Sequence, residues 1–162
     1  MPITEMCERC QEDPSEGLLH GIALFNAQEY FECHEVLEDV WNAERHPIRT
    51  IYKGIIQVGV GCYHLLRGNY RGATIKLQTG ADYLEPYAPV CFDFDIAGLI
   101  AATRTLRVAV VDAGPDNTTL VDRSLLPKIN RLKANDYAPA DRQQSSPPDM
   151  QIADEDRRDA ST

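Results

Sequence analysis

The segment from residue 47 to residue 67 carries apolar side chains almost all the way round a helix, and this feature restricts the fold most. A helix at a protein surface has one apolar stripe, whereas a helix that is apolar on every side has neighbours on every side. The segment also contains Gly54, Gly59 and Gly61, each of which costs roughly 1 kcal/mol of helix propensity relative to Ala. That cost is understandable if neighbouring helices approach closely there. We therefore predict a central helix inside a helical bundle.

Start and stop signals predict four further helices around this one. Asp13 is a typical helix cap and Pro14 is suited to the first helical position. Gly68 favours the left-handed conformation that ends a helix, and Asn69 can cap the next helix. The alternation of apolar and polar residues that is typical of strands is scarce. The predicted helices cover about residues 14–26, 28–45, 47–67, 70–84 and 94–112.

Five helices with short connections predict an all-α antiparallel bundle. We expect a flexible arm over residues 1–12 and a single helical-bundle domain over residues 13–135. Residues 136–162 are polar, acidic and Pro-bearing with few apolar anchors, so a disordered tail is expected there. The pattern over residues 120–132 fits either a short helix or an extended strap. A strap would be held by Leu125, Leu126 and Ile129.

Charge and hydropathy each exclude one class of partner. The chain has 16 basic and 25 acidic residues and a formal net charge of −9, whereas a nucleic-acid-binding protein needs a basic face to neutralise phosphates. No apolar run reaches the roughly 18 residues that a membrane-spanning helix requires. We therefore expect neither a nucleic acid nor a membrane as partner. Only four of the basic residues are Lys, which suits either a high-salt cytoplasm or a GC-rich genome.

The N-terminal residues show no apolar stretch typical of a secretory signal, so the sequence predicts a cytoplasmic protein. In that compartment the five cysteines are expected to be reduced thiols. Cys7 and Cys10 have the spacing of a metal knuckle. Because a zinc site needs a second such pair and the other cysteines are single, we interpret this pair as incidental.

The second predicted helix places two ionisable residues within an aromatic face. With 100° per residue, His34 and Glu38 fall among Tyr30, Phe31 and Trp41. An ionised carboxylate that is buried without a partner costs several kcal/mol. Glu38 is therefore paired, or protonated, or the face is not fully buried.

The central helix offers partners for this pair along one stripe, namely Lys53, Gln57, His64 and, somewhat offset, Arg67. We identify His34, Glu38, Gln57, His64 and Arg67 as a candidate site for a small-molecule or anionic ligand. His34, Glu38 and His64 are the alternative set for a divalent metal such as Zn, Fe or Mn, although about 7 to 8 Å along the axis separates the two histidines. If the chain is an enzyme, Glu38 and His34 are its acid–base pair.

A second interpretation is a non-catalytic interaction or homo-oligomerisation module. In that case His34 and Glu38 form a structural pair in the core. The subunit interface would then involve the apolar faces of the last two predicted helices or the Tyr-rich stretch from Tyr83 to Tyr87. The sequence leaves both interpretations open.

The motifs that carry these residues resemble a known family, DUF309, a group of small all-helical proteins. The first half of the resemblance is Phe25-Asn26-x3-Tyr30-Phe31-Glu32-x-His34-Glu35-x2-Glu38-x2-Trp41. The second half is Gly54-x-Ile56-Gln57 and Tyr63-His64-x2-Arg67-Gly68-Asn69, followed by Gly72-Ala73.

The resemblance covers about residues 18–90. It implies a helical fold and groups His34, Glu35, Glu38 and His64 as one unit, but the family has no established activity that could be carried over. The chain departs from many relatives in having Leu37-Glu38-Asp39 in place of Trp-Glu-Glu.

Overall fold

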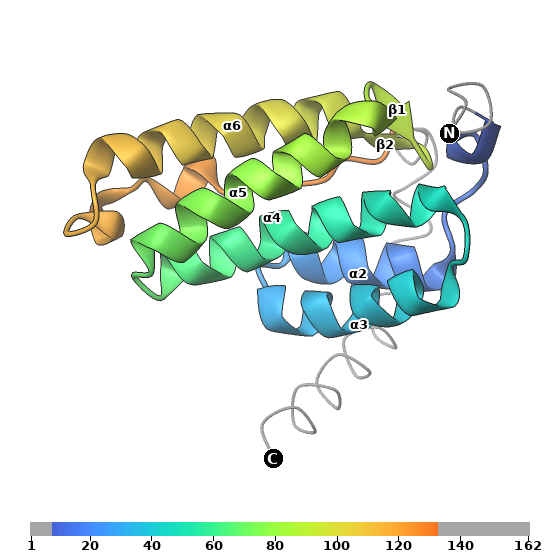
Figure 1. Ribbon diagram of the computed structural model, residues 1–162, viewed down its shortest axis with the longest axis horizontal. Helices are drawn as coiled ribbons and strands as arrows, with labels where there is room; N and C mark the ends of the chain where they lie inside the picture. Colours follow the sequence, from blue (N-terminus) through green and yellow to red (C-terminus); the bar gives the residue numbers. More distant parts are fainter. Residues whose placement is uncertain (1–7, 133–162) are drawn as a thin grey trace, which may run out of the picture. The chain divides into compact units, whose positions relative to one another are not determined.

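Five long helices follow one another in antiparallel order, with short connections between them (Figure 1). The computed structural model describes residues 8–132, so the predicted tail and residues 1–7 of the predicted arm lie outside the described residues. Residues up to Asn130 belong to one unit, and Arg131 and Leu132 belong to a second. The observed order confirms the predicted all-α bundle. The helices are α2 (Glu16–Asn26), α3 (Tyr30–Ala43), α4 (Thr50–Leu66), α5 (Tyr70–Leu84) and α6 (Ile96–Ala113).

Capping side chains set the starts of α2, α5 and α6, and α5 begins and ends where the sequence predicts. The start of α2 differs, because the Ser15 hydroxyl rather than Asp13 accepts a hydrogen bond from the backbone N–H of Leu18, at 3.1 Å. The start of α6 differs as well, since the carboxylate of Asp95 accepts from the N–H of Gly98 at 2.9 Å. A 3-10 turn, η1 (Pro47–Arg49), precedes α4.

A small β-hairpin before α6 was not predicted. Strands β1 (Val90–Cys91) and β2 (Phe94–Asp95) pair antiparallel, with Cys91 opposite Phe94. The two residues between the strands, Phe92 and Asp93, have φ values of 51° and 66°. Positive φ at both positions is the geometry of the tight hairpin turn that matches the twist of the strands. A two-residue strand is too short to leave a recognisable alternation in the sequence. Between α5 and this hairpin lies a further 3-10 turn, η2 (Glu85–Tyr87).

Helix α4 lies between α3 and α5 (Figure 1), as the apolar character of its sequence predicts. Two of its glycines allow close approach: a Cβ at Gly54 would lie 2.7 Å from the side chain of Leu84, and one at Gly61 would lie 2.8 Å from that of Leu77. The third behaves differently, because a Cβ at Gly59 would meet no atom closer than 3.6 Å. The predicted role in close packing is therefore confirmed for two of the three glycines.

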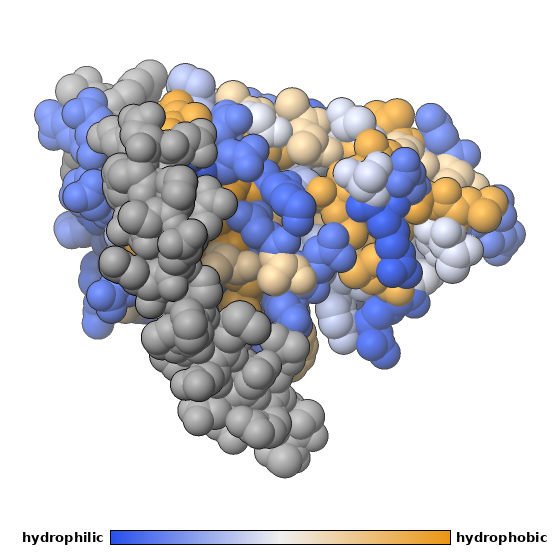
Figure 2. Space-filling model, turned by 180° about the vertical axis from the view of Figure 1, so that it is seen from behind, coloured by the Kyte–Doolittle hydropathy of each residue, from blue (hydrophilic) through white to orange (hydrophobic). Residues whose placement is uncertain are grey.

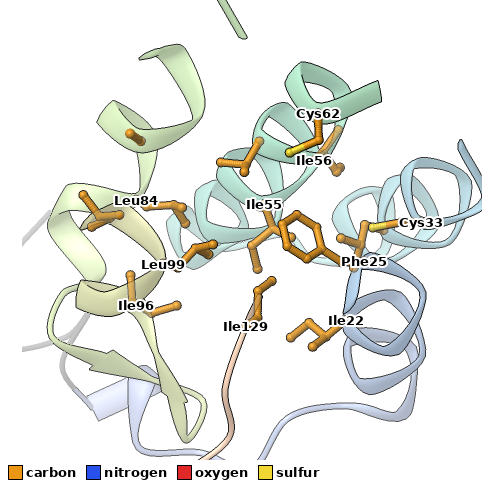
Figure 3. Packing of buried hydrophobic residues seen from close by; sticks show 14 of the residues in the cluster. Ile22, Phe25, Cys33, Ile55, Ile56, Cys62, Leu84, Ile96, Leu99 and Ile129 are labelled. Carbon is orange, nitrogen blue, oxygen red and sulfur yellow. The ribbon is translucent and has the colours of Figure 1, made fainter. Parts of the chain in front are cut away.

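A strap closes the core between α2 and α6. Residues 118–130 contain two 3-10 turns, η3 (Thr118–Leu120) and η4 (Arg123–Leu125), and continue without a helix. The Ile129 side chain, only 2% exposed, points into the cluster formed by residues such as Ile22, Phe25, Ile55 and Leu99 (Figure 3). Of the two alternatives that the sequence left open, the strap is therefore the one observed. Leu126 is buried with it and Leu125 is half-buried.

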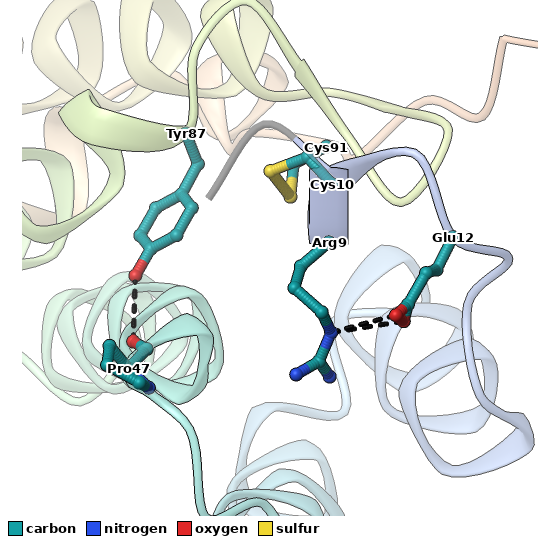
Figure 4. Close-up of a disulfide and its surroundings, with 6 residues drawn as sticks. All are labelled: Arg9, Cys10, Glu12, Pro47, Tyr87 and Cys91. Atoms are coloured by element: carbon teal, nitrogen blue, oxygen red, sulfur yellow. Dashed lines mark hydrogen bonds and ion pairs between the residues drawn. A yellow bond between two sulfur atoms is a disulfide. The ribbon is translucent and has the colours of Figure 1, made fainter. Parts of the chain in front are cut away.

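A disulfide joins Cys10 to Cys91, 81 positions later in the chain (Figure 4). The expectation that all five cysteines are reduced is therefore wrong for these two. It failed because a pairing across most of the domain leaves no local signal in the sequence. Cys33 and Cys62 are free and buried, and Cys7 lies outside the described residues.

Within residues 8–132, no helix combines the length and the apolar character needed to cross a bilayer.

Candidate functional site

Helix α3 presents His34 and Glu38 at the edge of its buried stripe. Tyr30, Cys33 and Leu37 form that stripe, while the His34 and Glu38 side chains are 43% and 37% exposed, with 3.7 Å between His34 Nε2 and Glu38 Oε2. On a helix, His34 and Glu38 lie about 60° and 100° away from Leu37. The alternative in which His34 and Glu38 form a pair inside the core is therefore wrong. Neighbouring helices cover only part of the aromatic face of α3, so the edge that carries these two residues stays exposed to solvent.

Gln57 lies half-buried on α4. Its side-chain oxygen, Oε1, is shielded from solvent and accepts no hydrogen bond within the structure. A buried carbonyl oxygen without a donor is costly. Of the five predicted ligand residues, Gln57 is the one whose buried side-chain oxygen lacks a hydrogen-bond donor within residues 8–132.

His64 lies in the last turn of α4, next to the connection to α5. Its backbone carbonyl accepts from the N–H of Asn69 at 2.8 Å, and that of Leu65 accepts from the N–H of Gly68 at 3.0 Å. With Gly68 at φ 78°, these are the two hydrogen bonds of a Schellman helix end. The ring of His64 packs on Gly72, where a Cβ would lie 2.7 Å away.

The His64 ring has local partners rather than distant ones. Its Nδ1 lies 3.3 Å from Nδ2 of Asn69, which can donate to a neutral imidazole. Burial and the nearby Lys76 ammonium lower the pKa of His64. Both effects favour the neutral ring within this turn. The residues from His64 to Asn69, which carry part of the family motif, thus have a structural role, because they end α4 and start α5.

The predicted metal set is not assembled. Within residues 8–132, no three His, Cys, Asp or Glu side chains come together in a way that could hold a metal ion. His34 and Glu38 are near each other on α3, but His64 lies at the far end of α4. The antiparallel register of the two helices predicts this separation, because His34 is level with a residue about five positions before His64.

Arg67 is exposed at the end of α4, above an aromatic pair. Its guanidinium carbon lies 5.4 Å from the ring centroid of Tyr63, within the range of a cation–π contact. The Tyr63 ring in turn lies 6.4 Å from that of Phe31, an α3 side chain that is 46% exposed. One end of the α3–α4 surface thus combines a cation with two aromatic rings.

The other end of this surface repeats that combination with residues that the predicted site omitted. The guanidinium carbon of Arg49 lies 3.7 Å from the ring centroid of Trp41, and the ammonium of Lys53 lies 5.0 Å from it. Nε of Arg49 is buried and has no hydrogen-bond partner in the part of the chain that the structure describes. Among residues 8–132, neither of these cations nor Arg67 forms an ion pair.

A charge pattern in the sequence could have revealed this surface. Residues 45–81 contain four Arg and two Lys, and all 25 acidic residues of the chain lie outside this run. The total charge of −9 conceals the pattern, because sign asymmetry is visible only when charge is followed along the chain. We name the surface formed by Phe31, His34, Glu38, Trp41, Arg49, Lys53, Gln57, Tyr63 and Arg67 the α3–α4 face.

Comparison with known proteins confirms the resemblance over this part of the chain. Residues 18–75 match the family model described as a domain of unknown function, DUF309. The chain is also similar to the uncharacterized protein YpuF of Bacillus subtilis, with 45% identity over 47 residues. That match covers 28% of this chain and 27% of YpuF. The matched family segment contains most of α2, all of α3 and α4, and the start of α5.

Proposed function

We propose that this protein, whose residues 18–75 match the DUF309 family model, is a non-catalytic interaction module. Its α3–α4 face binds an acidic segment of a partner protein. The observation that carries the proposal is the set of cations at Arg49, Lys53 and Arg67, which lie beside aromatic rings and form no ion pair in residues 8–132.

Charge complementarity supports an acidic partner. Arginine guanidinium groups match carboxylates with paired N–H donors, and aromatic residues and Arg are enriched at the centres of protein interfaces. The carboxylate of Glu38 also lies on this face, but it is one negative charge against the three cations Arg49, Lys53 and Arg67. The surplus on the face is therefore positive.

The length of the face supports an elongated partner rather than one small ion. Eighteen residues separate Arg49 from Arg67 along the chain, which corresponds to about 27 Å along a helix at 1.5 Å per residue. An extended peptide of about ten residues spans roughly 33 Å and can reach both cation–aromatic ends. The small ligand predicted from the sequence would contact only part of this set.

Titration with decaglutamate tests the proposal, because Trp41 is the only Trp of the chain and reports on the face directly. We expect decaglutamate to change Trp41 fluorescence in the full chain. Lys53→Gln and Arg67→Gln should each weaken binding about two- to five-fold, as expected for exposed charge pairs of about 0.4 to 1 kcal/mol. Added salt should weaken it further.

Arg123→Gln is the matched control, since it removes an exposed cation of η4 outside the α3–α4 face. Diglutamate should bind far more weakly than decaglutamate because it cannot span the face. Equal binding of acetate, diglutamate and decaglutamate would instead support the small-anion site. Absence of any decaglutamate response, or an Arg123→Gln effect as large as that of Lys53→Gln, would refute the proposal.

Self-association through α6 is a second candidate function, favoured by exposed apolar side chains. Val108 and Val111 on α6 are 57% and 42% exposed, and Leu120 is 76% exposed. From the side opposite to Figure 1, apolar patches interrupt the hydrophilic surface along the upper edge, where α6 lies (Figure 2). Val108→Lys should turn a dimer into a monomer in sedimentation velocity. A wild-type monomer at high concentration would exclude this function.

The cytoplasmic location that the sequence predicts stays a prediction.

A further inference from the structure

Residues 8–12 attach to the β-hairpin on one side and to the end of α3 on the other, and we name them the clasp. The disulfide joins Cys10 to the hairpin (Figure 4), and the carbonyl of Cys10 accepts a hydrogen bond from the N–H of Phe92 at 2.7 Å. The guanidinium of Arg9 lies 2.7 Å from the carboxylate of Glu44, the residue that follows α3. The clasp thus bridges two elements that are distant in sequence.

The disulfide accounts for most of this attachment. Of the clasp residues, Glu8, Gln11 and Glu12 are exposed, and Arg9 and Cys10 are half-buried. Fixing the backbone of such a segment costs conformational entropy at every residue. One backbone hydrogen bond and one partly exposed ion pair return less than this cost. The clasp therefore needs the covalent bond to stay closed.

The clasp lies against a stacked aromatic pair. The rings of Tyr52 and Phe92 are nearly parallel, at 6° and with 6.1 Å between centroids, and the two residues are 4% and 3% exposed. Burial and the nearby Glu44 carboxylate raise the pKa of Tyr52 to about 12, while the Arg9 guanidinium acts in the opposite direction. Because the clasp bonds to the backbone of Phe92 and brings Arg9 close to Tyr52, its release uncovers this pair.

The hairpin has contacts of its own that do not involve the clasp. The N–H of Asp95 donates to the carbonyl of Asn130 in the strap at 2.9 Å. The N–H groups of Ile96 and Ala97 both donate to the carbonyl of Pro89, each at 3.0 Å. The hairpin therefore keeps its place beside α6 and the strap when the clasp leaves, so that opening is local.

The two sulfurs of the disulfide differ in access. Cys91 is fully buried, at 0% exposure, whereas Cys10 is half-buried. A thiolate from solvent therefore attacks Sγ of Cys10, with Cys91 as the leaving group. The two free thiols within residues 8–132 do not compete, because burial raises the pKa of Cys33 and of Cys62 to about 12 each.

We propose that the Cys10–Cys91 disulfide is a redox-sensitive switch. A dithiol reductant opens it, which releases the clasp and uncovers Tyr52 and Phe92 while the helical bundle stays folded. This inference rests on the disulfide and is independent of the proposed binding function.

The reduction transfers two electrons from the dithiol to the disulfide. One thiolate of the reductant attacks Sγ of Cys10 and forms a mixed disulfide. The bond between Cys10 and Cys91 breaks, and its electron pair leaves with Sγ of Cys91, which takes up a proton. The second thiolate of the reductant then attacks the reductant sulfur of the mixed disulfide. This step releases Cys10, which takes up a proton, and leaves the reductant oxidised to an internal disulfide.

Hydrogen exchange of the full-length protein with and without excess dithiothreitol tests the proposal. The N–H groups of Gln11, Glu12 and Phe92 donate hydrogen bonds while the clasp is closed. After reduction, exchange at these three groups should become at least about tenfold faster and should exceed that of the α4 amides, as expected for local opening. Circular dichroism should show the same helix content in both states. A clasp that stays protected after reduction would overturn the proposal, and so would loss of the helical signal.

Two variants separate the disulfide from the other contacts of the clasp. Arg9→Gln removes the ion pair with Glu44 and keeps the disulfide, so its clasp should stay protected in the oxidised protein. Cys10→Ser should show fast exchange without reductant and no response to dithiothreitol. If oxidised Arg9→Gln opens as far as reduced wild type, the ion pair rather than the disulfide holds the clasp and the proposal is wrong.

Alkylation of the reduced wild-type protein gives a second readout, which does not depend on any variant. Cys10 should be alkylated at least about tenfold faster than Cys33 and Cys62, because local opening leaves those two thiols buried. Equal rates at all three cysteines would show that reduction unfolds the whole domain, which contradicts a switch.

Discussion

The side-chain amide of Asn26 pairs with the backbone of Ile129 in both directions, across 103 positions of the chain. Its Nδ2 donates to the carbonyl of Ile129 at 2.9 Å, and its Oδ1 accepts from the N–H of Ile129 at 2.8 Å. The Asn26 carbonyl also accepts from the ammonium of Lys128 at 2.7 Å. The Asn26 side chain thus makes the two hydrogen bonds that the backbone of a neighbouring strand would make, and these bonds hold the strap against α2.

Asn26→Ala should therefore lower the free energy of unfolding by about 2 to 3 kcal/mol, because it leaves two partly buried backbone groups of Ile129 without partners. Urea denaturation followed by circular dichroism measures the change. Asn42→Ala, at an exposed α3 position, should change stability by less than about 0.5 kcal/mol. Equal effects of the two substitutions would show that the amide pairing contributes nothing.

Two glycines of α4 should respond to the same substitution with opposite signs. A Cβ at Gly61 would lie 2.8 Å from Leu77 Cγ and 3.0 Å from its backbone nitrogen, so Gly61→Ala should cost about 1 to 3 kcal/mol through overpacking. Gly59→Ala meets only ordinary contacts and gains up to about 1 kcal/mol of helix propensity. Thermal unfolding of the two variants measures the difference. Two variants of equal stability would contradict the packing seen around α4.

The disulfide should contribute substantially to stability. For a separation of 81 positions, the loss of chain entropy in the unfolded state corresponds to about 4.5 kcal/mol. Cys10→Ser should lose most of that free energy in guanidinium denaturation. Addition of dithiothreitol should destabilise wild type to the same level and leave Cys10→Ser unchanged. A dithiothreitol effect of similar size in both proteins would show that the disulfide is not its target.

The contribution of His64 should make the free energy of unfolding rise with pH. Burial and Lys76 lower the pKa of His64 in the folded state below its ordinary value of 6.5, so the unfolded state binds more protons between the two pKa values. Stability should therefore fall as the pH drops through about 6.5 and level off below the folded pKa. Urea denaturation between pH 5 and 8 measures this slope, and His64→Gln should reduce it. An unchanged slope in His64→Gln would assign the effect to other groups.

Signals that act within a few residues predicted the helices well. Gly68 and Asn69 mark the end of α4 and the start of α5 because each satisfies backbone groups of its own neighbours. The start of α6 was predicted two residues too early, since Asp93 and Asp95 are both suitable caps. The hairpin contact of Phe94 with Cys91 decides between them.

The candidate site was only partly predictable, because burial depends on what packs above a face. Helical periodicity placed His34 and Glu38 next to each other, and the structure brings them to 3.7 Å. Periodicity could not show that they stay half-exposed. It also grouped His64 with them, whereas the ring packs on Gly72 in the next turn.

The sequence by itself determined the helical bundle, the central position of α4 and the sign asymmetry of charge over residues 45–81. These follow from residue spacing and local backbone chemistry, which act over a few positions. Only the tertiary structure decided the pairing of Cys10 with Cys91, the docking of Ile129 on Asn26 and the cations beside Trp41. Each of these contacts joins segments that come together only when whole helices pack against one another. A pattern within a few residues of the sequence does not contain this information.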